Sequence, residues 1–504
     1  MKKERSLFKH SVVIVTAVLI VVTASCLAAN SSAQLDEFYT IGEMNKASII
    51  MLSETGIVPK PLAAKIARGI AQVIAEGDQP GAKRPGDYLL IEPRLIEVVG
   101  PDASRIHSGR SRQDMLSTTE RIFLRDALLA TFESLNSSRD KLLTFAGGHI
   151  DTIIPAYTHG VQAQPTTLAH YLLAYAESLS RDGERLRQAY ARLNLSPLGA
   201  AALGTSSFPI NRLRLAALLG FEGLVENSYD ANHVSPWETN TELASMLAIS
   251  ALAIGNFAQD LHTQYHNPVP WITLKKGPLT GGSSIMPQKQ NPMGIEQLRT
   301  IASKVIGDAQ ATFFLPHNAS SGMFDYRFSD QTRLAAADAS SMYKLLGGVI
   351  DNLIVDCHRA LEEVDADYST MTEVADTLQR VGDVPFRIGH HFLSELTTYG
   401  RSQGMRPIEI PYEEAVRIFK EVTGGDKLPM TDVQFKAVMS AQNMVSMSRG
   451  IGGPQPAEVN RMLAHQRQRL EADRDWVKSQ RTKLQDASTM LQRAFTEMAE
   501  TGSN

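Results

Sequence analysis

The chain has 504 residues, of which 43% are hydrophobic and 21% charged, with a formal net charge of −4. This composition is that of a globular protein long enough for two or three domains, and it excludes an intrinsically disordered chain. The weak negative charge gives no indication of a nucleic-acid-binding surface.

The first 33 residues are predicted to be a secretory signal peptide. The chain opens on the basic residues Lys2, Lys3, Arg5 and Lys9. An apolar run follows over residues 12–22, interrupted only by Thr16, and it is too short for a typical membrane-spanning helix. Cleavage is expected after Ala33, Cys26 offers an alternative lipoprotein site, and an uncleaved anchor is the competing interpretation. We therefore expect an exported, periplasmic protein without membrane contact after cleavage.

Helical periodicity dominates the rest of the chain, and strand signals are scarce. Apolar residues recur at three and four positions over residues 168–179, 243–261 and 345–361. Such segments predict long buried helices of about 25 to 35 residues, packed side by side. Once the leader is removed, Cys357 is the only cysteine, which excludes an intrachain disulfide and a cysteine-based metal site.

The last predicted helix begins near Ala457 and has one apolar residue in every seven. These residues are Leu463, Leu470, Val477, Leu484 and Leu491. A coiled coil needs two apolar positions in each heptad, and the partner positions here are mostly Gln, Arg and Asp. We therefore expect a narrow apolar stripe that lies on the body of the protein or on a neighbouring subunit, with a free coiled coil as the alternative.

Three polar, glycine-containing segments carry candidate chemistry. Residues 281–292 (GGSSIMPQKQNP) form a loop that is flexible at one end and stiff at the other, and offers a hydroxyl, an ammonium and a carboxamide to one ligand; a plain linker is the alternative. Residues 106–114 place two arginines beside two hydroxyls, which suits carboxylate binding, although such a pattern alone is more often a solvated turn. In residues 157–167, His159 follows Thr158 and precedes a helix predicted to open at Pro165.

These segments resemble the argininosuccinate lyases of the fumarase/aspartase superfamily. Residues 281–292 match the signature loop of the superfamily, residues 106–114 resemble His-Thr-Gly-Arg-Ser-Arg-Asn-Asp-Gln, and residues 157–167 resemble Tyr-Thr-His-Leu-Gln-Arg-Ala-Gln-Pro-Thr-Thr. Weaker similarity covers residues 197–231, 376–391 and 452–454, so the resemblance runs in order from about residue 36 to residue 465.

The resemblance implies an all-α, three-domain fold whose central bundle of long helices forms the core of a homotetramer. The corresponding domains are residues 34–110, 111–366 and 367–476, followed by a helical extension over residues 477–504. In this family each active site draws its motifs from three different chains. Neither a metal nor an organic cofactor is implied, and the sequence has no HExxH or GxGxxG pattern.

The family chemistry removes a proton beside a carboxylate and then expels the nitrogen on the neighbouring carbon. By resemblance, Ser283 is the base, and Thr158 and His159 lie on the leaving-group side, where Glu296 pairs with the histidine and fixes its tautomer. The implied substrate-binding residues are Ser111, Arg112, Gln113, Lys289, Asn291, Tyr326 and Gln331.

Departures from the family pattern fall on the substrate contacts. Gln113 and Met115 replace an asparagine and a glutamine, Gly160-Val161-Gln162 replaces Leu-Gln-Arg, and Tyr88 stands near an expected histidine. The family's Gly-Ser-x-Ala-His motif is missing over residues 42–48. Leu334 takes the place of a lysine, for which Arg333 could substitute. The elimination machinery thus looks intact, whereas the pocket for the nitrogen-side group looks altered.

The predicted function is a carbon–nitrogen lyase that eliminates fumarate from argininosuccinate or a related N-substituted aspartate, so its partner is a small dicarboxylate. Three alternatives remain. The first is a non-catalytic helical homologue, as the lens delta-crystallins are in this family. The second is a fumarate-releasing lyase with a different substrate, and the third is a muconate-type cycloisomerase. The Ser-Arg-Gln segment at residues 111–113 favours the argininosuccinate branch over the cycloisomerase.

Overall fold

The computed structural model describes residues 36–323 and 330–501. The predicted signal peptide, Cys26 and Tyr326 lie outside these residues. Helices make up 68% of the structure and strands 6%, which confirms the predicted all-α class.

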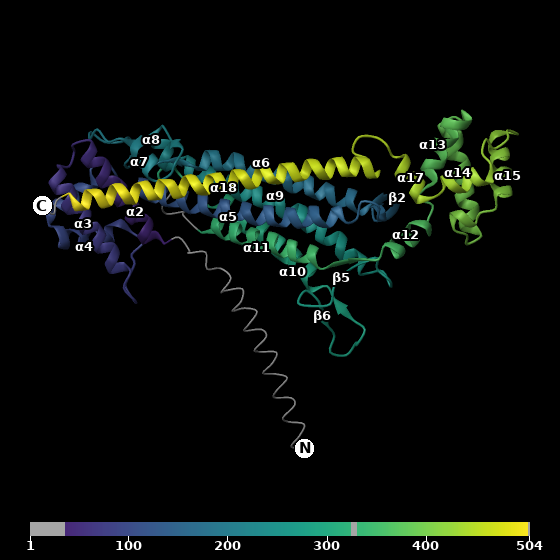
Figure 1. The fold of residues 1–504 in the computed structure, drawn as a ribbon, viewed down its shortest axis with the longest axis horizontal. Helices are drawn as coiled ribbons and strands as arrows, with labels where there is room; N and C mark the ends of the chain where they lie inside the picture. Colours follow the sequence, from purple (N-terminus) through teal and green to yellow (C-terminus); the bar gives the residue numbers. More distant parts are fainter. Residues whose placement is uncertain (1–35, 324–329, 502–504) are drawn as a thin grey trace, which may run out of the picture.

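Five long helices form the central bundle (Figure 1). They are α5 (Arg112–Gly147), α6 (Leu168–Leu193), α9 (Ser235–Gln264), α10 (Met293–Phe314) and α11 (Gln331–Asp351). Their apolar faces share one continuous core, in which Phe132, Leu172 and Leu247 are almost fully buried. Of the described helices, only α9 is long and apolar enough to cross a membrane, and it lies within this bundle. One face of α9, which includes Leu243, Leu247 and Ile254, packs in the core.

A second core lies at the end of the bundle where α5 begins. It is formed by α2 (Glu37–Glu54), α3 (Lys60–Gly77), α4 (Tyr88–Val99), the 3-10 helix η1 (Pro101–His107), α7 (Arg212–Leu218) and the end of α18 (Pro456–Glu500). The short helix α8 (Ser228–His233) leads from this region into α9. This core positions the segment 106–114.

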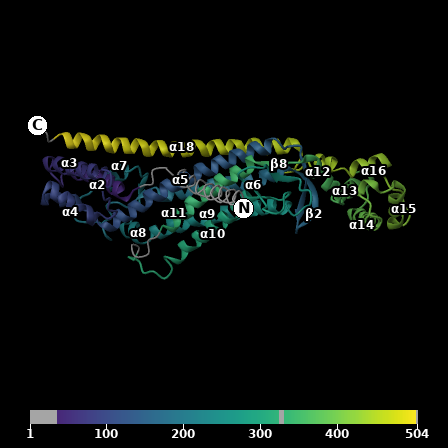
Figure 2. The same cartoon turned by 90° about the horizontal axis from the view of Figure 1, so that it is seen from below.

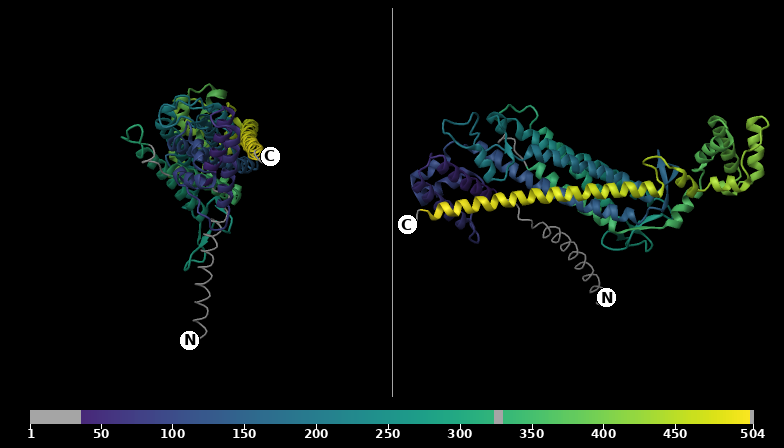
Figure 3. Two further views of the ribbon diagram at one scale, coloured as in Figure 1. Left: turned by 90° about the vertical axis from the view of Figure 1, so that its left-hand side faces the viewer. Right: turned by 45° about the horizontal axis from the view of Figure 1, so that its top comes forward.

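A third, smaller core lies at the opposite end of the molecule (Figures 1 and 3). It is formed by α13 (Met371–Gly382), α14 (Phe386–Ser402), α15 (Tyr412–Thr423) and α16 (Asp432–Val438). The 3-10 helix η2 (Pro407–Glu409) lies between α14 and α15, and α17 (Ala441–Met447) follows α16 and contacts β2 (Val161–Thr167) and α12 (Cys357–Asp365). Helix α12 connects this core to the bundle.

Helix α18 runs back along the whole bundle and is about 68 Å long at 1.5 Å per residue. It packs on α5 and α6 and, near its end, on α2 and α3. Leu463, Leu470, Val477 and Leu491 are buried, so the prediction of a stripe lying on the body of the protein is confirmed. The helix continues without a break through the expected boundary at residue 476.

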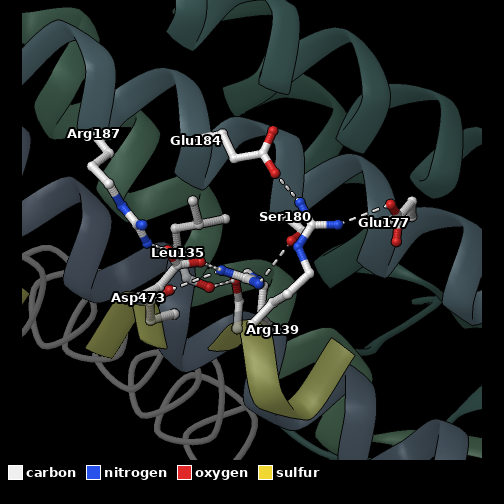
Figure 4. Close-up of polar contacts among 10 residues, drawn as sticks. Leu135, Arg139, Glu177, Ser180, Glu184, Arg187 and Asp473 are labelled. Carbon is white, nitrogen blue, oxygen red and sulfur yellow. Dashed lines mark hydrogen bonds and ion pairs between the residues drawn. The ribbon is translucent and has the colours of Figure 1, made fainter. Parts of the chain in front are cut away.

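Charged residues fix α18 on the bundle (Figure 4). Asp473 of α18 pairs with Arg139 of α5 at 2.5 Å and with Arg187 of α6. One helical turn before Asp473, Arg469 donates to Glu177 at 3.0 Å and also bonds Glu184. The contact between α18 and the bundle is therefore ionic as well as apolar.

In the described part of the chain, eight short strands form four two-stranded ladders. β1 (Ile153–Thr158) pairs antiparallel with β2 (Val161–Thr167), β5 (Ile272–Leu274) with β8 (Leu353–Val355), and β6 (Gly281–Gly282) with β7 (Gln290–Asn291); β3 (Leu195–Ser196) pairs in parallel with β4 (Gly223–Leu224). Two of these ladders, β5–β8 and β1–β2, include a strand where the sequence predicted helix. The expected helix over residues 345–361 is interrupted by β8, whose backbone pairs with β5, and α12 starts afresh after Asp356 caps it.

The other correction concerns Pro165, which lies within β2 and does not open a helix. It faces Pro155 of β1, and α6 begins three residues later at Leu168. The side chain of Thr167 accepts the backbone N–H of His170 at 3.2 Å and so supplies the N-cap. A capping threonine fixes this helix start more strongly than the preceding proline.

Candidate active site

Thr158 and His159 lie at the tip of the β1–β2 hairpin. Thr158 pairs with Val161, which leaves His159 and Gly160 as a two-residue turn. Both have positive φ, 54° for His159 and 78° for Gly160, as a type I′ turn requires. Gly160, a departure from the family pattern, therefore has a conformational reason. The turn is exposed to solvent.

Ser283 begins a loop whose ends are tied by the short β6–β7 ladder. Gly281 faces Asn291 and Gly282 faces Gln290 in this ladder. The hydroxyl oxygen of Ser283 accepts the backbone N–H of Ile285 at 3.4 Å and that of Met286 at 3.1 Å. Two amide dipoles thus converge on one oxygen, an arrangement that stabilises negative charge there. The same geometry also occurs in ordinary serine turns.

The remaining residues of this loop are accessible. Lys289 is exposed and Asn291 is half-buried at the end of the ladder. The loop projects from the side of the bundle (Figure 1). A Cβ atom at Gly281 would lie 2.3 Å from the sulfur of Met293, so a larger residue there would require the Met293 side chain to move. Ser283, Lys289 and Asn291 are therefore presented together, and they face solvent in the single chain.

Glu296 lies in the exposed first turn of α10. One turn later, Arg299 donates to Nδ1 of His262 on α9 at 2.7 Å, so the accepting nitrogen is unprotonated. Burial and the charge of Arg299 lower the pKa of His262, while Glu296 acts in the opposite direction. Among the described residues of one chain, no hydrogen bond or ion pair joins Glu296 to His159.

Ser111 and Asp114 shape the start of α5. The Ser111 side chain accepts a hydrogen bond from the backbone N–H of Gln113. The Asp114 carboxylate in turn accepts one from the backbone N–H of Ser111 at 2.8 Å, which completes a capping box. The other oxygen of Asp114 accepts the N–H groups of Gly199 at 2.8 Å and Ala201 at 3.0 Å. Burial raises the pKa of Asp114 to about 7, against these backbone donors, which lower it. Asp114 therefore joins two of the family-like segments.

Arg110 and Arg112, equivalent in the sequence, have different environments. Arg110 is buried: it donates to Ser48 and Asn45 at 3.0 and 2.8 Å, and its guanidinium lies 4.6 Å from the ring centre of Tyr88. Its role is structural, and Tyr88 supports it in place of the expected histidine. Arg112 is exposed and pairs with Asp87 at 3.2 Å. Of the two, only Arg112 is accessible to a substrate carboxylate.

The other departures also acquire definite places. Met115 is 2% exposed and belongs to the core around α2, so it is not a substrate contact. Arg333 pairs with Asp330 and lies over the ring of Phe123 at 4.8 Å, which directs it toward α5. Leu334 is 47% exposed and points elsewhere. Within one chain Arg333 therefore lies against α5, and its substitution for the family lysine stays a prediction.

Within one chain the candidate residues form separate groups. Ser111, Arg112 and Gln113 lie at the start of α5, and the hairpin with Thr158 and His159 lies beyond its other end (Figures 1 and 2). The 36 residues of α5 span about 54 Å. No single small substrate can touch both groups in one chain. Gln331 opens α11, on a different helix from either group.

Sequence reasoning passed over Asp114, although the pattern of a serine followed three residues later by an acid, before an apolar run, is the signature of a capping box. It also passed over Glu363 of α12, which bonds Tyr157 beside the hairpin turn. No local pattern marks that residue, because its partner is 206 positions away in the chain. The described residues hold no group of three or more His, Cys, Asp or Glu side chains placed to bind one metal ion.

Comparison with known proteins places the chain among lyases. Residues 22–307 match the protein family described as Lyase. Argininosuccinate lyase of Methanothrix thermoacetophila is 32% identical over 458 residues, which cover 89% of this chain and 91% of the relative. That of Methanocaldococcus jannaschii is 33% identical over 439 residues, covering 84% and 87% of the two chains.

Solved structures give the same result. EDDS lyase in complex with formate superposes with a TM-score of 0.84 at 29% identity, with 94% of each chain covered. A variant of EDDS lyase with bound fumarate gives a TM-score of 0.86 at the same identity and coverage. The class II fumarase of Schistosoma mansoni, at 14% identity and a TM-score of 0.65, has the same fold.

These comparisons correct the prediction of export. Seven relatives that cover 84–89% of this chain are argininosuccinate lyases, which are cytosolic enzymes. The prediction of an exported, periplasmic protein is therefore wrong. It depended only on the composition of residues that precede the matched helical fold, and an apolar run after basic residues is a compositional signal that carries no information about the fold behind it.

Proposed function

Because the chain belongs to the lyases of the fumarase/aspartase superfamily, we propose that it is a carbon–nitrogen lyase that releases fumarate from argininosuccinate or a related N-substituted aspartate. The observation that carries this proposal is the convergence of the Ile285 and Met286 amides on the hydroxyl oxygen of Ser283. A serine is a poor base in water, and fixed amide donors favour its alkoxide once loop closure excludes water.

The proposed reaction is an elimination. The Ser283 alkoxide takes the proton from the carbon beside one substrate carboxylate, and the electron pair left on that carbon forms the new double bond. The bond from the neighbouring carbon to nitrogen then breaks, and the nitrogen departs with its electron pair and acquires a proton on the side of Thr158 and His159. Lys289 and Asn291 hold the carboxylate on which negative charge develops.

The geometry supports a site assembled from several chains. The candidate residues are exposed or half-buried in one chain, and the group at the start of α5 is separated from the hairpin by the length of that helix. Large apolar side chains are also exposed on the bundle, among them Ile249 and Leu252 of α9 and Phe314 of α10, at 45%, 57% and 75%. Such a surface is typical of a contact between subunits. We infer a homotetramer in which Ser283 of one chain, Thr158 and His159 of another and Ser111 and Arg112 of a third meet.

The structural relationship with EDDS lyase supports a second substrate. It covers 94% of the chain, and the departures at Gln113 and Leu334 fall where the nitrogen-side group of argininosuccinate would be recognised. Loss of a cation at such a position changes specificity by orders of magnitude. EDDS is therefore proposed beside argininosuccinate as a substrate from which fumarate is released.

The test is fumarate release by the purified protein, followed by ultraviolet absorbance, with argininosuccinate and EDDS as alternative substrates. Ser283→Ala is expected to reduce the rate by about 10²-fold or more, since it removes the base. Ser303→Ala, on the exposed face of α10, is the matched control and should retain activity. If EDDS releases fumarate and argininosuccinate does not, the altered pocket is assigned to EDDS. If neither substrate releases fumarate, the result would favour the non-catalytic homologue.

A further inference from the structure

We propose that Glu363 of α12 is a positioning residue that holds the hairpin turn with Thr158 and His159 in its working orientation. This inference rests on the proposed function, because it concerns the leaving-group side of that site. It starts from the residues next to the turn. Tyr157 on β1 and Gln162 on β2 are cross-strand partners, immediately before and after the segment 158–161.

Both members of this cross-strand pair bond to adjacent residues of one helix. The Tyr157 hydroxyl donates to the Glu363 carboxylate, and the side-chain amide of Gln162 donates to the backbone carbonyl of Val364 at 3.1 Å. The two strands are thus attached to α12 one residue pair before the Thr158–Val161 pair that closes the turn. The attachment is specific, since α12 contacts both β1 and β2.

Glu363 is itself held in place. Arg359, one helical turn earlier, donates to its second carboxylate oxygen at 2.9 Å, and the Arg359 side chain also donates to the carbonyl of Val269 at 3.1 Å. The Glu363 side chain is only 17% exposed and that of Arg359 26% exposed. An ion pair that is largely removed from water and bonded at both ends has a fixed geometry. Burial and the neighbouring Glu363 raise the pKa of the Tyr157 hydroxyl, which therefore remains a donor at neutral pH.

The backbone pairing of β1 with β2 does not by itself fix the orientation of the turn. Its register shifts between Ala156 and Tyr157, so the backbone pairing is irregular one residue before the clamp. The two-residue turn beyond is internally stiff, and its direction is set by Tyr157 and Gln162 at its base. A misplacement of about 1 Å at a catalytic group costs about 10²-fold in rate. The bond to Glu363 therefore governs where the Thr158 hydroxyl and the His159 ring point.

The experiment compares Glu363→Gln with Glu362→Gln. Glu362 is the preceding residue of the same helix; its side chain is 53% exposed and pairs only with the exposed His358 at 3.2 Å, among the described residues. Glu363→Gln is expected to lower kcat about tenfold or more, with KM changed less than about twofold, because the turn is misdirected while the carboxylate-binding residues are untouched. Glu362→Gln should match the wild type.

Tyr157→Phe tests the other half of the bond. It should reproduce the fall in kcat, and the double variant with Glu363→Gln should lose little more than either single variant, because both remove one interaction. The midpoints of thermal unfolding should stay close to that of the wild type. Additive losses, an equal loss in Glu362→Gln, or a wild-type kcat in Glu363→Gln would overturn the proposal.

A failure of the proposed function is distinguishable from a failure of this inference. If the wild type releases no fumarate, the proposed function fails, and amide hydrogen exchange still tests the clamp. Exchange at residues 157–162 should be faster in Glu363→Gln than in Glu362→Gln, because local opening of the hairpin becomes easier. Equal exchange in the two variants would show that Glu363 does not hold the turn.

Discussion

The guanidinium of Arg139 on α5 lies 2.5 Å from the carboxylate of Asp473 on α18, and their side chains are only 1% and 6% exposed. Burial lowers the pKa of Arg139, and Asp473 opposes this change. The pair is central to the network of Figure 4, in which Arg187 also bonds Asp473. Two helices distant in sequence are thus joined by charges that have almost no access to water.

Asp473→Asn should destabilise the protein by about 3–5 kcal/mol, because it leaves Arg139 buried without its counter-charge. The free energy of unfolding in urea measures this loss. Glu497→Gln is the control on the same helix, since Glu497 pairs with Arg493 at 2.9 Å but both side chains are more than 60% exposed. Its effect should stay within about 0.5 kcal/mol. Equal effects of the two variants would contradict the ionic role of Asp473.

Gly183→Ala should destabilise the folded protein, although a change from glycine to alanine in a helix interior usually stabilises it. Alanine normally gains about 0.5–1 kcal/mol over glycine there. At Gly183, however, a Cβ atom would lie 3.0 Å from a carboxylate oxygen of Asp473 and 3.3 Å from a guanidinium nitrogen of Arg139, neither of which can retreat. Gly307→Ala on α10, with no atom within 4 Å of the added Cβ, should stabilise. Thermal unfolding of the two variants should therefore move in opposite directions.

His159→Asn tests the chemical role of the turn, and Gly160→Ala tests its conformation. Asparagine tolerates the left-handed conformation that His159 adopts, so this variant should fold normally and lose fumarate release. Alanine at Gly160 meets no atom within 4 Å, but its φ of 78° should cost about 1–2 kcal/mol. Hydrogen exchange in β1 and β2 should rise in Gly160→Ala alone. A rise in both would mean that the histidine ring stabilises the hairpin.

Glu120 should make stability fall as pH rises from about 4.5 to about 7. It is 2% exposed, and the charge of Arg333 and the side-chain amide of Asn240 favour its ionised form. Burial raises its pKa to about 7, and the charge of Arg333 offsets this only in part. The native state therefore retains a proton that the unfolded state releases in this range, and native stability decreases as pH increases.

Glu120→Gln removes this contribution. The unfolding free energy of the variant should improve relative to the wild type, by about 3 kcal/mol at most, between the pKa of the unfolded glutamate and a pH above 7. Urea unfolding at acidic and at mildly alkaline pH gives the comparison, and all other titrating groups cancel between the two proteins. Parallel pH profiles would show that Glu120 is ionised in the native state.

Mixing Ser283→Ala with His159→Asn should restore activity if each site is shared between chains. Each variant alone lacks one essential group at every site. After subunit exchange, a site that takes its serine from one chain and its histidine from the other variant is complete, and random mixing produces this combination at about one quarter of the sites. The restored activity is measured as fumarate release from the mixture, with each pure variant as control. A mixture as inactive as its components would place both residues of a site in one chain.

The sequence was sufficient for elements whose signal is local and repeated. The 3.6-residue periodicity indicated the bundle helices, and the spacing of Leu463, Leu470 and Val477 indicated that α18 lies on the protein body. It was insufficient where partners are distant. The run over residues 345–361 looks helical throughout, and only the pairing of β8 with β5, 81 positions earlier in the chain, interrupts it.

The candidate site shows the same division. The residue types in the Ser283 loop were recognisable, but the buried role of Arg110 was not, because it depends on Asn45, Ser48 and Tyr88 in other elements. Arg110 and Arg112 have the same chemistry and differ only in the direction that the capped start of α5 imposes. The proposed assembly of the site from separate chains likewise rests on the length of α5, which no motif contains.

The course of α18 has a consequence for synthesis of the chain. Leu491 and Phe495 belong to the core around α2 and α3, and Lys46 bonds Gln492 across 446 positions of sequence. Helices α2 and α3 are thus synthesised long before the end of α18, and their shared core is complete only when that end has been made. During translation this surface stays open and exposed to premature association. A truncation of a few residues at the end of the chain would therefore be felt at its beginning.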